Sequence, residues 1–130
     1  MSSPIKDENI IERKHADMVL ALAKPGFDII QQMTDEQAHA LHMAAGSSGE
    51  AGELLDAIKK WAIYQKPLDL NNVIEELGDL EFYLEGLRRG LCISREQTLM
   101  HNMEKLAKRY PSYRYSNADA IARADKEGTV

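Results

Sequence analysis

The chain has 130 residues, about the size of one domain that can bury a single core, and we expect residues 1–130 to form one domain. Apolar residues make up 44% and charged residues 28%, which is typical of a soluble globular protein and argues against wholesale disorder. The net charge of −5 argues against a partner that is a nucleic-acid polymer, because binders of such polymers usually carry surplus Lys and Arg on one face.

The sequence also gives an expectation for the cellular setting. Cys92 is the one cysteine, so no intramolecular disulfide can form. The start MSSPIKDENIIERKH lacks the basic and apolar regions of a secretion signal, and no apolar run approaches the roughly 20 residues that cross a bilayer. We therefore expect a cytoplasmic protein without a membrane partner, located in the host cytoplasm if the source is a phage.

The first predicted element is a helix over about residues 6–24. Apolar residues return every three or four positions along the whole chain, and sustained strand-like alternation is missing, so we expect an all-α fold. Pro25–Gly26 should end this first helix. Its inner side is expected to carry Ile10, Ile11, Met18, Val19 and Leu22.

The second predicted helix begins at the letters TDEQ and runs towards Lys60. Thr34 can cap its start, and Gln37 can reach back to complete a capping box. Residues 46–52, GSSGEAG, hold three glycines but not the G-x-x-x-x-G-K-[ST] pattern of a phosphate-binding loop. These small residues favour close contact with another helix.

The remaining helices have clear start signals. The third opens after DLNN, residues 69–72, whose polar side chains can accept the free amide hydrogens, and it continues to about Leu91. The fourth starts at SREQ, where Ser94 and Gln97 predict another capping box, and extends to Arg109. A short last turn or helix is expected in SNADAIARA.

Two acidic pairs of one design lie on the second and third predicted helices. GEAGELLD holds Glu50 and Glu53, and EELGDLE holds Glu76 and Asp79. At about 100° per residue, positions three apart project from one face of a helix. Apolar residues follow or surround each pair, so we expect the acids at the edge of the core.

The two acidic pairs can lie opposite each other, at equal distances from the connection between their helices, only if the second helix ends early. A helix intact to Pro67 would place Glu53 roughly 20 Å from the turn and Glu76 only about 10 Å from it. If the helix ends near Lys60, with WAIYQKPLDL as an irregular connection, both pairs lie about 8 to 10 Å from their helix ends. The sequence therefore predicts a break near Lys60.

Four carboxylates at one place predict a bound metal ion. They would repel one another unless protons or cations neutralised their charge. Oxygen ligands favour Mg²⁺ or Mn²⁺ over zinc, and Mg²⁺ normally keeps waters and recruits substrate phosphates. We expect Mg²⁺ as the cofactor, with Mn²⁺ able to replace it, and chemistry on a phosphate ester or anhydride.

The combined pattern resembles a known family. The order of the acidic motifs resembles that of the MazG-like, all-α nucleoside triphosphate pyrophosphohydrolases: E-x-x-E, then 22 residues, then E-x-x-D. EELGDLEFYLEGL is similar to the third helix of that family, and NMEKLAKRYP and YSNADAIAR resemble its later segments. The resemblance covers roughly residues 38–123, within a motif-bearing core of about residues 34–123.

The resemblance implies a fold, an assembly and a reaction. The fold would be a four-helix MazG-like bundle, assembled as a homodimer or as a dimer of dimers. The reaction would convert a nucleoside triphosphate to its monophosphate and pyrophosphate, with water attacking the α-phosphate. The implied metal ligands are Glu50, Glu53, Glu76 and Asp79. Glu75 or Glu50 is the candidate to take the proton of the water.

Substrate contacts are expected after the acidic pairs. Asn102, Lys105 and Arg109 recur at three- and four-residue spacing and are the candidates to bind phosphate, with a plain surface role as the alternative. Trp61 and Tyr113 are candidates to contact the base or, alternatively, to cover the core.

Other hypotheses stay open. One is a noncatalytic helical interaction module with a structural acidic metal site, and another is an enzyme similar to phosphoribosyl-ATP pyrophosphohydrolases. The letters KLAKRYP favour the MazG-like interpretation over the latter. No motif encodes base or sugar choice, but several short proteins that resemble this chain come from phages and act on deoxynucleotides. The leading substrate is therefore dGTP, followed by dCTP or dUTP.

Overall fold

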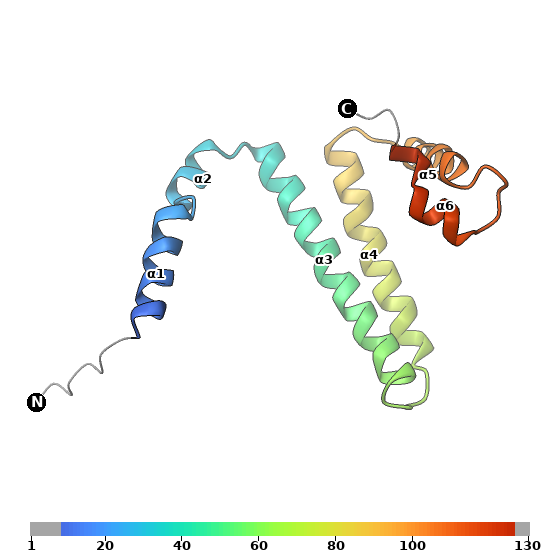
Figure 1. Cartoon of the computed structure of the whole chain (residues 1–130), viewed down its shortest axis with the longest axis horizontal. Helices are drawn as coiled ribbons and strands as arrows, with labels where there is room; N and C mark the ends of the chain where they lie inside the picture. The colour runs from blue at the N-terminus through green and yellow to red at the C-terminus, as the bar shows by residue number, and fades with distance from the viewer. Residues whose placement is uncertain (1–8, 127–130) are drawn as a thin grey trace, which may run out of the picture. The chain divides into compact units, whose positions relative to one another are not determined.

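A computed structural model describes residues 9–126, and every regular element in that range is helical (Figure 1), which confirms the all-α class. The chain divides into two compact units, Met1–Thr34 and Asp35–Val130. Both acidic pairs lie in the second unit. Across the described range, no helix is long and apolar enough to cross a membrane.

The first unit contains α1 (Ile10–Leu22) and α2 (Gly26–Gln32). Asn9 caps α1 by accepting a hydrogen bond from the amide of Ile11 at 2.9 Å. The expected start of this helix at residues 6–8 lies outside the described residues. The chain then leaves the helix before Pro25, as predicted.

The sequence analysis missed α2, which starts directly after the proline. Pro25 occupies the cap position of this helix, and a fixed φ near −65° suits a helix start as well as a helix end. The apolar residues assigned to the inner side of the first helix are all exposed within the described chain: Ile10, Ile11, Met18, Val19 and Leu22.

The second unit is built on two long helices, α3 (Asp35–Ala62) and α4 (Leu70–Gly90). They pack side by side, joined by a short connection (Figure 1). Met43 and Ala57, both on α3, are the hydrophobic residues buried in the described range. The interior of the helix pair is therefore thin.

Glycines set how closely α3 and α4 approach. A side chain at Gly46 would run into the ring of Tyr83, and one at Gly86 would run into the sulfur of Met43. The imidazole of His39 lies against Gly90, and its Nε2 is 3.0 Å from the carbonyl oxygen of Gly86. The close contact with another helix that was predicted for residues 46–52 is thus made by Gly46, against Tyr83 of α4.

The connection between α3 and α4 confirms the predicted early break. The helix ends at Ala62, close to Lys60, instead of continuing to Pro67. Gln65 adopts a positive φ of 55° in the connection, and its side-chain amide donates to the carbonyl of Ala62 at 2.9 Å. Asp69 then caps α4 by accepting from the amide of Asn72 at 3.1 Å.

The chain continues into α5 (Arg95–Arg109), α6 (Asn117–Ala122) and a 3₁₀ turn, η1 (Ala124–Lys126). The predicted capping box of α5 is confirmed, because Ser94 and Gln97 exchange both hydrogen bonds. Ser116 caps α6, which confirms the expected short last helix. α5 packs against α6 and η1.

The Thr34–Gln37 capping box stays a prediction, although α3 does begin at Asp35. Packing between the long helices of the second unit is concentrated in the pair α3 and α4. Many large apolar side chains of the described residues are exposed, among them Leu55, Phe82 and Leu99. The single domain and the oligomer expected from the sequence also stay predictions.

The close approach at Gly46 can be tested by adding one methyl group. Gly46→Ala should lower the free energy of unfolding, because overpacking costs about 1 to 3 kcal/mol. That cost exceeds the roughly 0.5 to 1 kcal/mol that alanine gains over glycine inside a helix. Chemical denaturation at a fixed protein concentration measures the difference.

Gly49→Ala is the matched control on the same helix, since nothing lies near the position of its added methyl group. It should leave the free energy of unfolding unchanged or raise it by up to about 1 kcal/mol. Equal effects of the two substitutions would contradict the contact between Gly46 and Tyr83.

Candidate metal and active site

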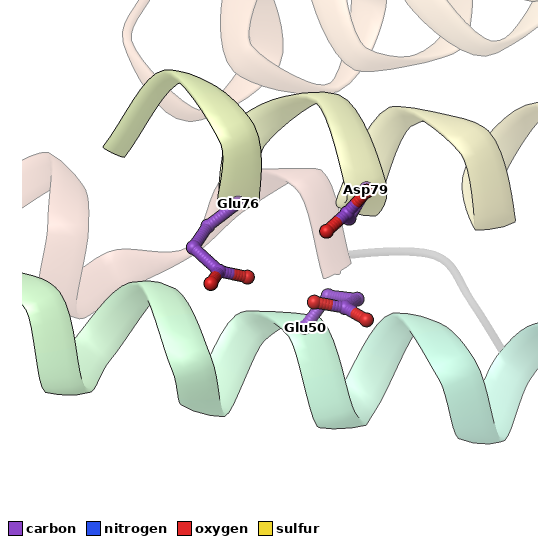
Figure 2. Close-up of side chains that lie close together, drawn as sticks. All are labelled: Glu50, Glu76 and Asp79. Carbon is purple, nitrogen blue, oxygen red and sulfur yellow. The ribbon is translucent and has the colours of Figure 1, made fainter. Parts of the chain in front are cut away.

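Three of the four predicted metal ligands come together across the helix pair. Glu50 on α3 and Glu76 and Asp79 on α4 each offer a carboxylate oxygen, and these oxygens all lie within 4.8 Å of one another. Figure 2 shows the three side chains between the two helices. A divalent cation with a preference for oxygen ligands fits this donor set.

Local structure explains why these acids meet. Asp69 fixes the start of α4, and Glu76 and Asp79 follow at positions that share one face of that helix. The end of α3 at Ala62 brings Glu50 level with them, as the predicted break requires. The close approach at Gly46 holds the helices near enough for short acidic side chains to span the gap.

The other two predicted acids lie outside this group of three. Glu53 is exposed, but its charge still acts on Glu76 and helps to raise the pKa of that carboxyl. Glu75 is also exposed, and it points about 100° away from Glu76 because the two are consecutive in a helix. Their roles as metal ligand and proton acceptor stay predictions.

The electrostatics of Glu76 indicate a site that lacks positive charge. Its pKa is raised, first because the protonated carboxyl can share a hydrogen bond with Glu50, then because of burial and the charges of Glu50, Glu53 and Asp79. Its Oε2 atom is buried and has no hydrogen-bond partner among the described residues. A buried acceptor without a partner is unfavourable, and a cation would satisfy it.

The phosphate-binding candidates on α5 separate into two kinds. Asn102 and Lys105 are exposed and line a cleft of about 330 Å³. Arg109 is instead bonded through Nε and Nη2 to the two carboxylate oxygens of Asp125, at 2.9 and 3.2 Å. Its predicted contact with phosphate would have to compete with that ion pair.

The two aromatic candidates are both accessible. Trp61 lies near the end of α3 with 48% of its surface exposed, and Tyr113 is 84% exposed. Tyr113 helps to line an apolar pocket of about 330 Å³ together with Tyr110 and Tyr115. The rings of these last two are 5.9 Å apart, so the tail tyrosines form a cluster of their own.

The sequence analysis missed the contribution of the last turn. Lys108, Asp125 and Lys126 line the same cleft as Asn102 and Lys105. The spacing of Asp125 from Arg109, 16 residues, exceeds the three- and four-residue intervals that reveal neighbours on one helix. No pattern in the sequence could therefore have paired them.

The protein is therefore an all-α protein in which carboxylates from two helices, α3 and α4, face one another at a candidate metal site. A family described as the MazG nucleotide pyrophosphohydrolase domain matches residues 37–113, more than half of the chain. The chain belongs to this family, which confirms the resemblance and supports nucleotide pyrophosphohydrolase activity in general. Comparisons with curated proteins and with solved structures found no significant match.

The raised pKa of Glu76 should make the stability of the metal-free protein depend on pH. The folded protein holds this proton to a higher pH than the unfolded chain, whose Glu76 titrates near its ordinary value of 4.5. The free energy of unfolding should therefore fall as the pH rises from 4.5 towards the raised pKa. Glu76→Gln should flatten this fall, as measured by chemical denaturation in EDTA.

Glu75→Gln is the neighbouring control and should keep the fall. The lowered pKa values of Glu85 and Asp125 act at lower pH, because those carboxyls gain protons only below their ordinary values of 4.5 and 3.8. A pH dependence that is identical in Glu76→Gln and in the unsubstituted protein would contradict the assignment to Glu76.

Proposed function

We propose that this protein is a Mg²⁺-dependent nucleoside triphosphate pyrophosphohydrolase, which forms a monophosphate and pyrophosphate. The observation that carries the proposal is the meeting of Glu50, Glu76 and Asp79 across two helices of a MazG domain. The buried, unpartnered oxygen of Glu76 supports it, because that atom lacks the positive neighbour that a cation would supply.

The acidic residues of the chain would have different roles in metal binding and in proton transfer. Glu50, Glu76 and Asp79 hold the cation, with Glu53 as the predicted fourth ligand. Bound Mg²⁺ supplies Lewis-acid chemistry at the phosphoryl oxygens and lowers the pKa of a water. Glu75 stands outside the group of three, so it is the candidate to take the proton as water attacks the α-phosphate.

The substrate proposal extends to α5 and the aromatic residues. Asn102 and Lys105 are the proposed contacts to the phosphate chain, and their exposure in a cleft on α5 supports this proposal. Trp61 and Tyr113 offer accessible ring surface for a base. We keep dGTP as the first substrate to test, followed by dCTP and dUTP, and Mn²⁺ as the substitute metal.

The exposed apolar surface supports a homodimer or homotetramer. Side chains such as Ile11, Leu20 and Ile30 in the first unit are mostly exposed, and so are Phe82 and Leu99 in the second. Exposed apolar area on this scale is typical of chains that bury it against a partner. The proposed setting for such an assembly is the cytoplasm.

Product analysis tests the proposed reaction. The purified protein is incubated with each ordinary NTP and dNTP, with Mg²⁺ or with EDTA, and the monophosphate, diphosphate, pyrophosphate and phosphate are resolved. We expect monophosphate and pyrophosphate with Mg²⁺ and no turnover with EDTA. Glu50→Gln, Glu76→Gln and Asp79→Asn should each lower kcat by at least about 100-fold, because each removes a metal ligand.

Glu81→Gln is the matched control, because Glu81 is an exposed carboxylate on α4 outside the group of three. It should retain the activity of the unsubstituted protein. Diphosphate and phosphate as products would show that the other anhydride bond is cleaved. The absence of turnover by folded, metal-loaded protein would favour a noncatalytic module or a substrate outside the common nucleotides.

A further inference from the structure

The ring of Tyr83 packs between the two long helices, one helical turn from the carboxylates. Tyr83 follows Asp79 by four residues on α4, and Gly46 precedes Glu50 by four residues on α3. Four residues span about 6 Å along a helix and return to the same face. A methyl group at Gly46 would collide with Cδ1, Cε1 and Cζ of the ring, so the backbone of α3 already rests against it.

Two aromatic neighbours restrict how far this ring can move. Phe82, the preceding residue on α4, meets it edge-on, with ring centroids 5.2 Å apart and 89° between the ring planes. His42 of α3 meets it at 6.2 Å and 63°. Edge-to-face contact is a favoured arrangement of aromatic pairs, so the half-buried ring of Tyr83 resists displacement. It therefore sets a lower limit to the distance between the helices at Gly46.

Two further close approaches lie along the same helix pair, at increasing distance from the carboxylates. Gly86 faces the side chain of Met43, and Gly90 faces the imidazole of His39. The two glycines lie seven and eleven residues beyond the last carboxylate of α4 in the group of three, which corresponds to about 10 and 16 Å along the helix. The spacing at the carboxylates should therefore depend most on Tyr83 and least on Gly90.

The spacing of the helices decides the size of the cation that fits. Mg²⁺ binds oxygen at about 2.0 to 2.1 Å in near-ideal octahedral geometry, whereas Ca²⁺ accepts about 2.3 to 2.6 Å and a more flexible arrangement. Glu50 on α3 faces Glu76 and Asp79 on α4 (Figure 2), so the donor oxygens move apart when the helices do. Glu76 and Asp79 share one helix, which leaves the gap between the helices as the variable dimension.

We propose that Tyr83 is a positioning residue that sets the gap between α3 and α4, through its contact with Gly46, to the size of Mg²⁺. That a metal ion binds between these helices rests on the proposed function. In this role Tyr83 acts through the backbone of α3, so its effect is on which cation binds. The ring and not the hydroxyl has this effect, because the contacted atoms are ring atoms.

The first test measures the cation preference of the metal-free protein in the absence of nucleotide. Mn²⁺ binding is followed by electron paramagnetic resonance, and Mg²⁺ and Ca²⁺ are each used to displace the Mn²⁺. Gly46→Ala should weaken Mg²⁺ binding at least about tenfold, because it misplaces the ligands, and Ca²⁺ binding less than about threefold. A loss of stability alone would weaken the binding of both ions equally. An unchanged ratio of the two affinities would therefore overturn the proposal.

Gly90→Ala is the matched control, because it adds the same methyl group at the close approach farthest from the carboxylates. It should lower the stability of the fold, as measured by chemical denaturation, and leave the ratio of Mg²⁺ to Ca²⁺ affinity within about twofold. A shift of this ratio as large as that in Gly46→Ala would overturn the proposal, since the effect would then follow stability and not distance from the carboxylates.

Substitution of the tyrosine itself separates the ring from its hydroxyl and decides the question if Gly46→Ala does not fold. Tyr83→Phe keeps the ring and should keep the affinity ratio within about twofold. Tyr83→Val removes Cδ1, Cε1 and Cζ, so the gap is no longer fixed and the preference for Mg²⁺ should fall about tenfold. Equal ratios in these two variants would overturn the proposal.

A double variant tests whether the two residues act through one contact. Gly46→Ala combined with Tyr83→Val places the added methyl group in the space that the ring leaves. The preference for Mg²⁺ should recover to a value above that of either single variant, because residues in contact give non-additive effects. Losses that simply add would overturn the proposal.

Failure of the proposed function would look different. A preference for Mg²⁺ that depends on Tyr83, in a protein that hydrolyses no nucleotide, would support the positioning role and contradict the proposed reaction. Mg²⁺-dependent release of monophosphate and pyrophosphate, by a protein whose cation preference is the same in Gly46→Ala and Tyr83→Val, would support the reaction and overturn the positioning role.

Discussion

Repulsion among three carboxylates across the helix pair is the constraint on which the rest of the structure depends. Glu50, Glu76 and Asp79 bring their oxygens within 4.8 Å without a positive side chain in the group. Like charges at this distance favour separation of α3 and α4, and one consequence is the raised pKa of Glu76. The helices stay together because other contacts oppose that repulsion, and a bound cation would turn it into attraction.

The opposing contacts are few and specific. Tyr83 packs on Gly46 and Met43 packs on Gly86, so that an added side chain at either glycine would require its neighbour to move. Met43 and Ala57 are the hydrophobic residues buried in the described chain, so the pair draws little stability from a core. Few residues are buried between the helices, and the carboxylates repel one another. Metal binding and burial against a partner subunit, the two proposals made above, would therefore both stabilise the fold.

Local signals in the sequence predicted the parts of the fold that local physics controls. The Ser94–Gln97 capping box and the end of α3 near Lys60 follow from cap chemistry and helix rise. α2 was missed because a proline that ends one helix also starts the next. Helical spacing put Glu53 with Glu50 on one face, but spacing does not decide which side chains reach across to a second helix.

Long-range contacts were beyond prediction from periodicity. The pairing of Arg109 with Asp125 depends on how α6 and η1 turn back towards α5, and no spacing rule encodes that turn. The sequence therefore indicated Arg109 as a phosphate contact but not its pairing with Asp125. The phosphate contact stays a prediction. The family pattern indicated the acids as one group, whereas the structure brings Glu50, Glu76 and Asp79 together and leaves Glu53 outside that group.

The central claim is that α3 and α4 each contribute ligands to one cation. Titration of the metal-free protein with Mn²⁺, with the free ion followed by electron paramagnetic resonance, tests it most directly. The account predicts that Glu50→Gln and Asp79→Asn each weaken Mn²⁺ binding by at least about tenfold, and that Glu81→Gln binds like the unsubstituted protein. Unchanged Mn²⁺ affinity after substitution of the acid on either helix would contradict a site shared between the two.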